Sequence, residues 1–457
     1  MAVAPSLTER LVDRALAVRW EKVPPQAQER VKHLFLDFLG VALGGRGLAD
    51  STPAVRRAGQ ALAKGARGTC TVVGENRRYP PPVAAFLNAT FAHSLDFDDT
   101  HRESIIHPGA PIFATLLALA EVHHTSGKVF LEAALAGYEV TCRIGIAHGE
   151  AVHRRGFHPT ATTGVFGAVA AGAHLLGLSP EATLDALGLA GSMASGSLQF
   201  IATGGWNKRV HVGLAAHNAL YALTLAQSGV RGARQPLEGT YGYLRAYGDG
   251  TVDMTRASLG DGDWQVLHTA VKPYPSCRYN HAVIDAIVDL ARRYEIDPAE
   301  VRRIRVVLPP VGHALVAVPP EQKRRPHTSV EGQFSVYFAA AVALLQKGLT
   351  WGSYQRLHDP QVQALMERVC AEADATVEGM GARVTLEGYA GQRWETSIRY
   401  PRGEPENPLP WPHLVGKFLD LACTVLPREH ADRLLDRVST VEMEADMASL
   451  ICLLRPA

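Results

Sequence analysis

The chain has 457 residues, and its 46 Lys and Arg against 45 Asp and Glu give a formal net charge of +1. This length suggests about two or three domains, and a hydrophobic content of 47% is that of a globular protein rather than a disordered one. A net charge this close to zero argues against a nucleic-acid-binding protein that relies on a bulk positive field.

The N-terminal part of the chain, up to about residue 265, is predicted to be helical. Residues 25–44 place apolar side chains at helical spacing, with Pro25 in the first turn and Gly44–Gly45 expected to end the helix. Residues 163–178 are apolar nearly all round and rich in Ala and Gly, which is typical of a central, buried helix. Other helices are expected over residues 81–95, 110–124, 129–148, 161–177, 180–190 and 212–228.

No stretch resembles a secretory signal or a membrane span. Residues 1–16 carry four charged side chains and no apolar core. The longest apolar runs, such as residues 111–120, fall short of the roughly 18 residues that a spanning helix needs. We therefore expect a cytoplasmic protein with no membrane partner.

Composition changes after residue 268, where strands are expected beside helices. Residues 301–309 alternate and are rich in β-branched side chains, and residues 382–401 have the pattern of a β-hairpin. Residues 329–347 and 359–374 are predicted to be helices, which makes an α+β pattern. The proline-rich residues 402–412 are expected to be a linker, and helical periodicity returns over residues 413–425 and 428–436.

This order of elements predicts a mainly α fold with two domains. A large all-helical domain is expected from residues 1–268 and 399–457. A smaller α+β domain, residues 269–398, is expected to be inserted into it. The two connections of the inserted domain would then form a hinge.

The densest polar cluster runs from His93 to His101 and is followed by His107. Because it follows an apolar helical run, we expect it at a helix end that faces a cavity. Three aspartates and three histidines within 15 residues leave three interpretations open. They are a metal site, acid–base chemistry without a metal, and helix capping by Asp and Thr.

Two further motifs present a histidine or cations. His158 stands just before a long small-residue helix, where backbone N–H groups favour anions, although a histidine there can also be a cap or a surface residue. Lys208 and Arg209 follow Gly204–Gly205. Their spacing is not that of a Walker A phosphate loop, and their apolar flanks favour one cation that points into a pocket.

The last motif, residues 271–281, presents Lys272, Arg278 and His281 from a proline-rich segment. It lies at the predicted domain boundary, where pockets often form. Cys277 is a conceivable nucleophile, but inert packing is the commoner role of such a cysteine. The six cysteines include no C-x-x-C pair, so the sequence contains no zinc or redox motif.

These residues together suit a small di- or tricarboxylate. The cations Lys208, Lys272 and Arg278 can fix carboxylates, and a histidine base can remove a proton from the neighbouring carbon. Fixed Lys and Arg can stabilise the resulting carbanion-like state without a metal.

Four motifs in this order resemble those of the MmgE/PrpD family. They are HSLDFDDTH with HPG, GFHPTATTG with HLLGLS, KRVHVGLAA, and KPYPSCRYNHAVIDA. Members of this family include 2-methylcitrate dehydratase, cis-aconitate decarboxylase and iminodisuccinate epimerase. The resemblance covers nearly the whole chain. It implies a helical domain built from both chain ends with an inserted lid, a homodimer, an active site between the domains, and no organic cofactor.

The resemblance also implies site residues, and we expect no metal among their ligands. By motif, the pocket positions are Asp96, Thr100, His107, His158, Lys208 and Lys272. Arg278 and His281 are added from the physical argument and the SCRYNH pattern, and Tyr337 in QFSVYFAAA aligns with a lid tyrosine. Catalytic roles are expected for His158, His107, Asp96, Lys208 and His281, and substrate binding for Thr100, Lys272, Arg278 and Tyr337.

The leading hypothesis is a hydro-lyase that dehydrates 2-methylcitrate or a related hydroxy acid. His158 or His107 would remove the α-proton, and Asp96 would orient a histidine or carry the second proton. Decarboxylase-like members have a histidine shortly after the lid lysine, where this chain has Cys277, which disfavours decarboxylation of cis-aconitate. An epimerase on the same scaffold is the alternative, and a non-catalytic binding or accessory protein is a third possibility.

Overall fold

The computed structural model describes residues 4–257, 260 and 262–456, and the chain folds into two compact units. Unit 1 contains the residues up to Ser94, Asp98–Ala270 and the residues from Pro410 on. Unit 2 contains Leu95–Phe97 and Val271–Leu409. The domain boundaries expected from the sequence are 268/269 and 398/399. The two units divide at 270/271 and 409/410, and three residues of the acidic motif belong to unit 2.

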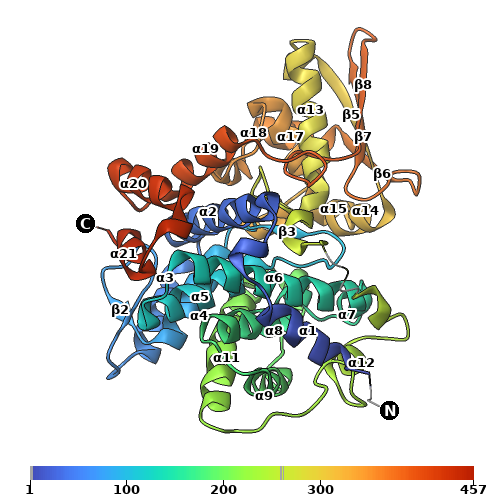
Figure 1. The fold of residues 1–457 in the computed structure, drawn as a ribbon. Helices are drawn as coiled ribbons and strands as arrows, with labels where there is room; N and C mark the ends of the chain where they lie inside the picture. Colours follow the sequence, from blue (N-terminus) through green and yellow to red (C-terminus); the bar gives the residue numbers. More distant parts are fainter. Residues whose placement is uncertain (1–3, 258–259, 261, 457) are drawn as a thin grey trace. The chain divides into compact units, whose positions relative to one another are not determined.

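Unit 1 is built almost entirely of helices (Figure 1). Its N-terminal helices are α1 (Leu7–Leu16), α2 (Pro25–Leu48), α3 (Thr52–Leu62), α4 (Pro81–Ala92), α5 (Gly109–His123), α6 (Gly127–His148) and α7 (Ala151–Arg154). The helices that follow are α8 (Pro159–Leu175), α9 (Pro180–Gly191), α10 (Phe200–Thr203), α11 (Asn207–Gln227) and α12 (Tyr243–Tyr247). The C-terminal ones are α19 (Trp411–Ala422), α20 (Arg428–Ser439) and α21 (Met447–Ile451).

Helix α8 is the centre of unit 1, as its small, apolar composition predicted. It packs against α5, α6, α9 and α11, and each of its residues is buried. A Cβ at Gly167 would lie 1.4 Å from Thr141 Oγ1 on α6. Glycine is therefore required at this contact between α8 and α6.

Helix α2 runs further than the sequence indicated. Gly44 and Gly45 were expected to end it, but the helix continues through both to Leu48. A Cβ at Gly45 would lie 1.9 Å from the carbonyl oxygen of Phe91 on α4. These glycines serve close helix packing rather than termination, which local sequence signals do not distinguish.

Short strands connect distant segments of unit 1. β1 (Cys70–Thr71) pairs with β2 (Arg78–Tyr79), and β3 (Thr100–His101) pairs with β4 (Thr269–Ala270), both antiparallel. The β3–β4 pair joins the end of the acidic motif to the last residues of the Asp98–Ala270 segment of unit 1.

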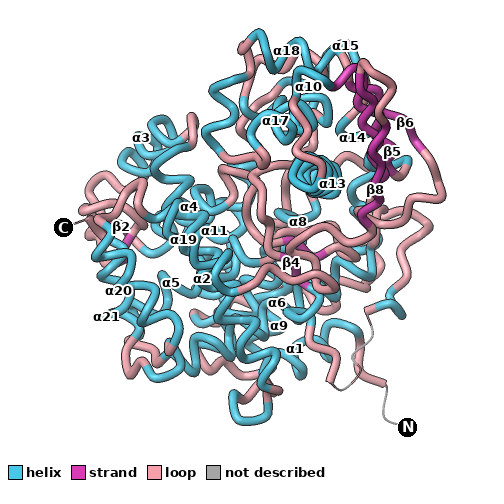
Figure 2. The backbone as a smooth tube through the Cα atoms, turned by 90° about the horizontal axis from the view of Figure 1, so that it is seen from above, coloured by secondary structure: helices cyan, strands magenta, loops and turns pink. Residues whose placement is uncertain are grey.

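Unit 2 contains a four-stranded sheet, whose strands are magenta in Figure 2, and its strand order is β6-β5-β7-β8. Its strands are β5 (Val301–Leu308), β6 (Val369–Ala373), β7 (Ala382–Gly388) and β8 (Arg393–Ile398). Only the β5–β6 pair is parallel. The helices of unit 2 are α13 (His281–Arg293), α14 (Pro310–Val316), α15 (Pro320–Lys323), α16 (Ser329–Gln333), α17 (Val336–Gln346) and α18 (Pro360–Glu367). Helix α13 packs against β7, β8 and α17.

Two helices predicted in this region are shorter than expected. The predicted helix 359–374 ends with α18 at Glu367, and its second half is strand β6, because pairing with β5 satisfies its backbone and buries Val369. The predicted helix 329–347 breaks after Gln333, where the Ser335 side chain accepts a hydrogen bond from the backbone of Phe338 and starts α17.

The described residues are mainly helical with small sheets, which confirms the predicted mainly α class. Among these residues, no helix is both long and apolar enough to cross a bilayer.

Candidate active site

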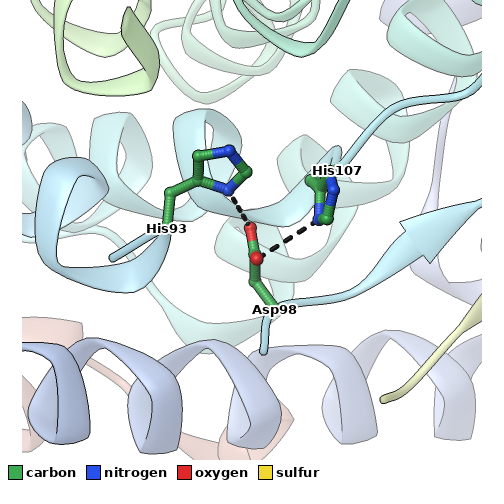
Figure 3. A group of neighbouring side chains, drawn as sticks. All are labelled: His93, Asp98 and His107. Carbon is green, nitrogen blue, oxygen red and sulfur yellow. Dashed lines mark hydrogen bonds and ion pairs between the residues drawn. The ribbon is translucent and has the colours of Figure 1, made fainter. Parts of the chain in front are cut away.

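Asp98 lies between two histidines of unit 1 (Figure 3). His93 follows the last residue of α4 and places Nδ1 2.6 Å from Asp98 Oδ2, while His107, just before α5, places Nδ1 3.2 Å from Asp98 Oδ1. Burial raises the pKa of Asp98, but the charges and hydrogen bonds of both histidines outweigh it and hold the pKa well below its ordinary value. A single ionised carboxylate therefore faces the Nδ1 atoms of two histidines.

The neighbouring side chain, Asp99, is protonated, whereas Asp98 is ionised. Gly109 N–H donates to its Oδ1 at 3.0 Å, and the Tyr138 hydroxyl donates to its Oδ2 at 2.6 Å. Burial, to which the negative charges of Asp98 and Asp37 add, raises the pKa of Asp99 to about 8. Asp99 therefore keeps its proton at neutral pH, and it anchors the acidic segment to α5 and α6.

The raised pKa of Asp99 predicts a pH-dependent gain in stability for Asp99→Asn. The pKa of about 8 lies above the unfolded value of about 3.9, so the folded protein holds a proton that the unfolded chain releases. Asp99 therefore costs the folded state progressively more free energy as pH rises from about 4 to 8. Chemical denaturation of both proteins at several pH values measures this effect. We expect the free energy of unfolding of the variant to increase relative to that of the wild type as pH rises over that range. A constant difference would contradict the assigned protonation state.

Four histidines form a row that begins at Asp98. The ring centroids of His107 and His93 are 4.8 Å apart, those of His93 and His158 are 5.6 Å apart, and those of His158 and His211 are 5.7 Å apart. The row joins the end of α4, the start of α5, the start of α8 and the first turns of α11. Segments that are distant in sequence thus meet within unit 1.

Backbone bonds fix two members of this row. His158 is the N-cap residue of α8, and its N–H donates to the carbonyl of Gly196 at 2.9 Å. The backbone N–H of His107 donates to Thr160 Oγ1, in the first turn of α8, at 3.2 Å. The expectation that His158 stands immediately before α8 is confirmed.

The two histidines at the far end of the row, His158 and His211, are neutral at neutral pH. Burial, followed by the charges of His93, Lys208, His211 and His107, lowers the pKa of His158 well below its ordinary value. Burial and the charge of His93 lower the pKa of His211 to about 4. Among the described residues, buried His93 Nε2, His158 Nδ1 and His211 Nδ1 have no hydrogen-bond partner. These nitrogens are polar groups that a bound ligand can satisfy.

Lys208 and His211 are three residues apart on α11 and so share one face of that helix. Gly204 adopts a left-handed conformation (φ +67) at the end of α10 and turns the chain into α11. The adjacent cation, Arg209, has a different role: it is 3% exposed, it pairs with Asp50, and it donates to Ser51 Oγ at 2.8 Å. Of the two cations in this motif, Lys208 is the one whose charge acts on His158.

A second set of predicted residues lies in unit 2. Lys272 Nζ donates to the backbone oxygen of Asp96 at 2.8 Å and lies 3.1 Å from its Oδ1, and both side chains are buried. Asp96 has a left-handed backbone (φ +50), which Asp tolerates better than most residues. Lys272 thus holds this turn through both the backbone and the side chain of Asp96. The carboxylate that contacts His93 and His107 is Asp98, and the role given above to Asp96 stays a prediction.

The other predicted residues of unit 2 also have partners. Arg278 is ion-paired with the buried Glu404. His281 begins α13, and its Nε2 lies 3.2 Å from the carbonyl oxygen of Ser276, while burial, with the charges of Arg278 and Lys272, lowers its pKa. The Tyr337 hydroxyl donates to the carbonyl of Ala317 at 3.2 Å.

Thr100 lies in strand β3 of unit 1. The buried Cys277 donates its backbone N–H to the carbonyl of Gln333 at 3.0 Å. The roles in substrate binding given above to Thr100, Arg278, Lys272 and Tyr337 stay predictions.

The His93–Asp98–His107 cluster also has the composition of a metal site. One ligand atom from each residue lies within 4.8 Å of the others, and two histidines with a carboxylate suit several divalent metals. However, His93 Nδ1 and Asp98 Oδ2 are 2.6 Å apart, which is the spacing of a charge-assisted hydrogen bond. Two atoms each about 2.1 Å from one ion lie farther apart, at about 3 Å. We therefore describe the group as a hydrogen-bonded cluster.

Three residues of the row were missing from the predicted site: His93, Asp98 and His211. His93 and Asp98 lie inside the acidic motif, but which of its three carboxylates turns toward the histidines depends on the left-handed turn at Asp96. His211 follows Lys208 by three residues, and helical periodicity was the signal that could have found it.

Comparisons with known proteins support the family resemblance that the sequence motifs indicate. The MmgE/PrpD N-terminal domain model matches residues 9–254, and the MmgE/PrpD C-terminal domain model matches residues 274–442. A cis-aconitate decarboxylase-like protein of Aspergillus oryzae is 29% identical, over 98% of this chain and 97% of its own. A cis-aconitate decarboxylase of Aspergillus terreus is 28% identical (98% and 96%), and that of Homo sapiens is 27% identical (98% and 95%). Since the two family models together match most of the chain, this protein belongs to the MmgE/PrpD family.

Proposed function

We propose that this protein is a lyase of small polycarboxylates that transfers a proton at a carbon next to a carboxylate. The observation that carries the proposal is the placement of His107. Its Nδ1 faces the buried, ionised Asp98, and its side chain remains 14% exposed. A carboxylate in this position stabilises the imidazolium that forms when the histidine takes a proton.

His158 suits a different role from His107. Burial and the surrounding positive charges keep it neutral, and a neutral imidazole can donate a hydrogen bond to negative charge that develops on the substrate. The sequence left His158 and His107 as equal candidates for the base. Because a carboxylate faces His107 whereas positive charges surround His158, we propose His107 as the proton-transfer group and His158 as the group that supports the carbanion-like state.

Lys208 is the cation that we propose for the first substrate carboxylate. It lies on the same face of α11 as His211, and its charge reaches His158. In unit 2, Lys272 and Arg278 each have a carboxylate partner, Asp96 and Glu404 respectively.

The bond that breaks sets the reaction type. In a decarboxylation the electrons of the broken C–C bond stay on the substrate, CO2 leaves, and an imidazolium gives a proton to the carbanion. In a dehydration the histidine takes the α-proton, and hydroxide leaves with a proton from an acid. The relatives compared above are named as cis-aconitate decarboxylases or as similar to them. We therefore propose decarboxylation first, which reverses the order drawn from the sequence.

Dehydration of a 2-methylcitrate-like hydroxy acid stays the second candidate. The observation in its favour is Cys277, which stands where decarboxylase-like members carry a histidine.

Proton NMR in D2O tests the proposal with the wild-type chain and a panel that includes cis-aconitate and 2-methylcitrate. We expect deuterium to enter one substrate next to a carboxylate. Loss of CO2 with a new alkene indicates decarboxylation, a new alkene without CO2 indicates dehydration, and exchange with inversion alone indicates an epimerase. If no member of the panel exchanges, turns over or raises Tm, the protein is not a polycarboxylate lyase.

A further inference from the structure

We infer that Asp98 is a positioning residue that fixes the protonation pattern of two histidines at once and so makes His107 Nε2 the proton-transfer atom. The inference rests on the function proposed above and extends it to a residue that does not touch the substrate. Its basis is the arrangement in Figure 3, where one carboxylate faces the Nδ1 atoms of both His93 and His107.

The ionised state of Asp98 decides which nitrogen of each ring carries a proton. An ionised carboxylate accepts hydrogen bonds and donates none. His93 Nδ1 is hydrogen-bonded to Asp98 and must therefore carry a proton, and we infer the same for His107 Nδ1, which lies 3.2 Å from Asp98 Oδ1 as its ion-pair partner. In a neutral ring the lone pair then belongs to Nε2. Asp98 thus gives both rings the same tautomer, with the basic nitrogen on the side away from the carboxylate.

The burial of the two rings agrees with this pattern. His93 Nε2 is buried and, within the described part of the chain, has no hydrogen-bond partner, so no other contact competes with Asp98 in deciding the tautomer of this ring. His107 is the only member of the His93–Asp98–His107 cluster that is not buried. Of the two nitrogens that Asp98 makes basic, the one on His107 is therefore the one that a substrate can reach.

Asp99 provides a matched comparison within the chain. It is adjacent to Asp98 and equally buried, but it bonds Gly109 and Tyr138 rather than histidines. Because burial raises its pKa to about 8, it is already neutral at pH 7. An amide closely resembles the neutral Asp99, whereas it differs from the ionised Asp98 in both charge and hydrogen bonding. The same substitution at these two positions therefore separates the role of the charge from damage to the loop.

Asn at position 98 cannot reproduce the observed arrangement. Its amide oxygen can accept from one Nδ1–H, but its NH2 group must donate to the other Nδ1, which shifts the proton of that ring to Nε2. Either His107 loses its basic Nε2, or it keeps the tautomer and loses the negative charge that supports its imidazolium. Both outcomes lower kcat, and neither removes a contact to the substrate.

The experiment combines kinetics with nitrogen NMR on the full-length chain. With 15N-labelled histidine, the rings of His93 and His107 are assigned by His→Gln variants, and the site of each ring proton is read from two-bond and three-bond 15N–1H couplings. We expect both rings of the resting wild-type protein to be protonated on Nδ1. For Asp98→Asn we expect one ring to move its proton to Nε2, with kcat about 10²-fold lower and KM nearly unchanged. Asp99→Asn is expected to keep kcat within about threefold, because it leaves these tautomers as they are.

Each outcome decides the inference. An Nδ1 without a proton in either ring of the wild type overturns it, and so does Asp98→Asn with unchanged kcat. A stoichiometric metal ion in the purified wild-type protein that is lost in Asp98→Asn also overturns it, because the three residues would then be ligands. If Asp98→Asn does not fold, the wild-type tautomers still decide. If the wild type shows no proton exchange with any polycarboxylate, the proposed function fails, whereas the resting-state tautomers still report on Asp98.

Discussion

Replacing His107 with glutamine is expected to lower kcat/KM for substrate proton exchange by about 10³-fold. Glutamine keeps a polar side chain near Asp98, but it cannot take and return a proton near neutral pH. The remaining rate would come from substrate binding and from the neutral His158. The measurement is deuterium incorporation by NMR, with the Tm of the variant recorded beside it.

His101→Gln is the control for this substitution. His101 belongs to the same motif and is buried, and its Nδ1 lies 2.8 Å from Ser104 Oγ rather than beside Asp98. Burial lowers the pKa of His101 to about 3, so it is neutral at pH 7. We expect this variant to keep most of the activity. If His107→Gln stays within tenfold of the wild type, His107 is not the base, and His158 becomes the group to test.

Replacing Lys417 with methionine is expected to destabilise the protein by about 3–5 kcal/mol. Lys417 on α19 lies 2.6 Å from Asp37 on α2, and the two side chains are 6% and 1% exposed. Methionine fills a similar volume but leaves the carboxylate of Asp37 buried without its cation, which is the costly case. Urea denaturation followed by circular dichroism measures the change in free energy of unfolding.

Two further variants test the cause of this effect. The double variant Asp37→Leu with Lys417→Met removes both charges and is expected to recover much of the loss, because no buried charge stays unpaired. Asp432→Ala breaks the exposed i,i+4 pair with Arg428 on α20 and is expected to leave Tm almost unchanged. A double variant no more stable than Lys417→Met would show that the loss comes from packing rather than from charge.

The fold could be predicted to the extent that local signals decide it. Central helices such as α8 follow from apolar side chains at helical spacing, and strand β5 follows from alternating β-branched residues. Strand β6 could not be predicted, because its backbone is held by a partner about 65 residues away, in β5. The continuation of α2 through Gly44–Gly45 likewise depends on Phe91 and Leu421, which lie on other helices.

The candidate site was predictable at the level of motifs but not of contacts. His107, His158 and Lys208 stand out because each precedes or begins a helix in a polar motif within apolar surroundings. The sequence alone did not distinguish the roles of the three carboxylates of the acidic motif. Their roles differ because of features of the folded chain: the left-handed turn at Asp96, the Tyr138 hydroxyl beside Asp99, and the two imidazoles beside Asp98.

The opposite states of Asp98 and Asp99 also affect how an anionic substrate approaches. A count from the sequence assigns two negative charges to this pair, but at neutral pH the folded protein carries one there. A di- or tricarboxylate that diffuses toward the histidine row therefore meets less repulsion from this pair than the sequence suggests, and Lys208 adds attraction. Fields of this kind act mainly on the rate of encounter and weaken as salt screens them. The protonation of one buried carboxyl group thus bears on how fast an anionic substrate reaches the protein.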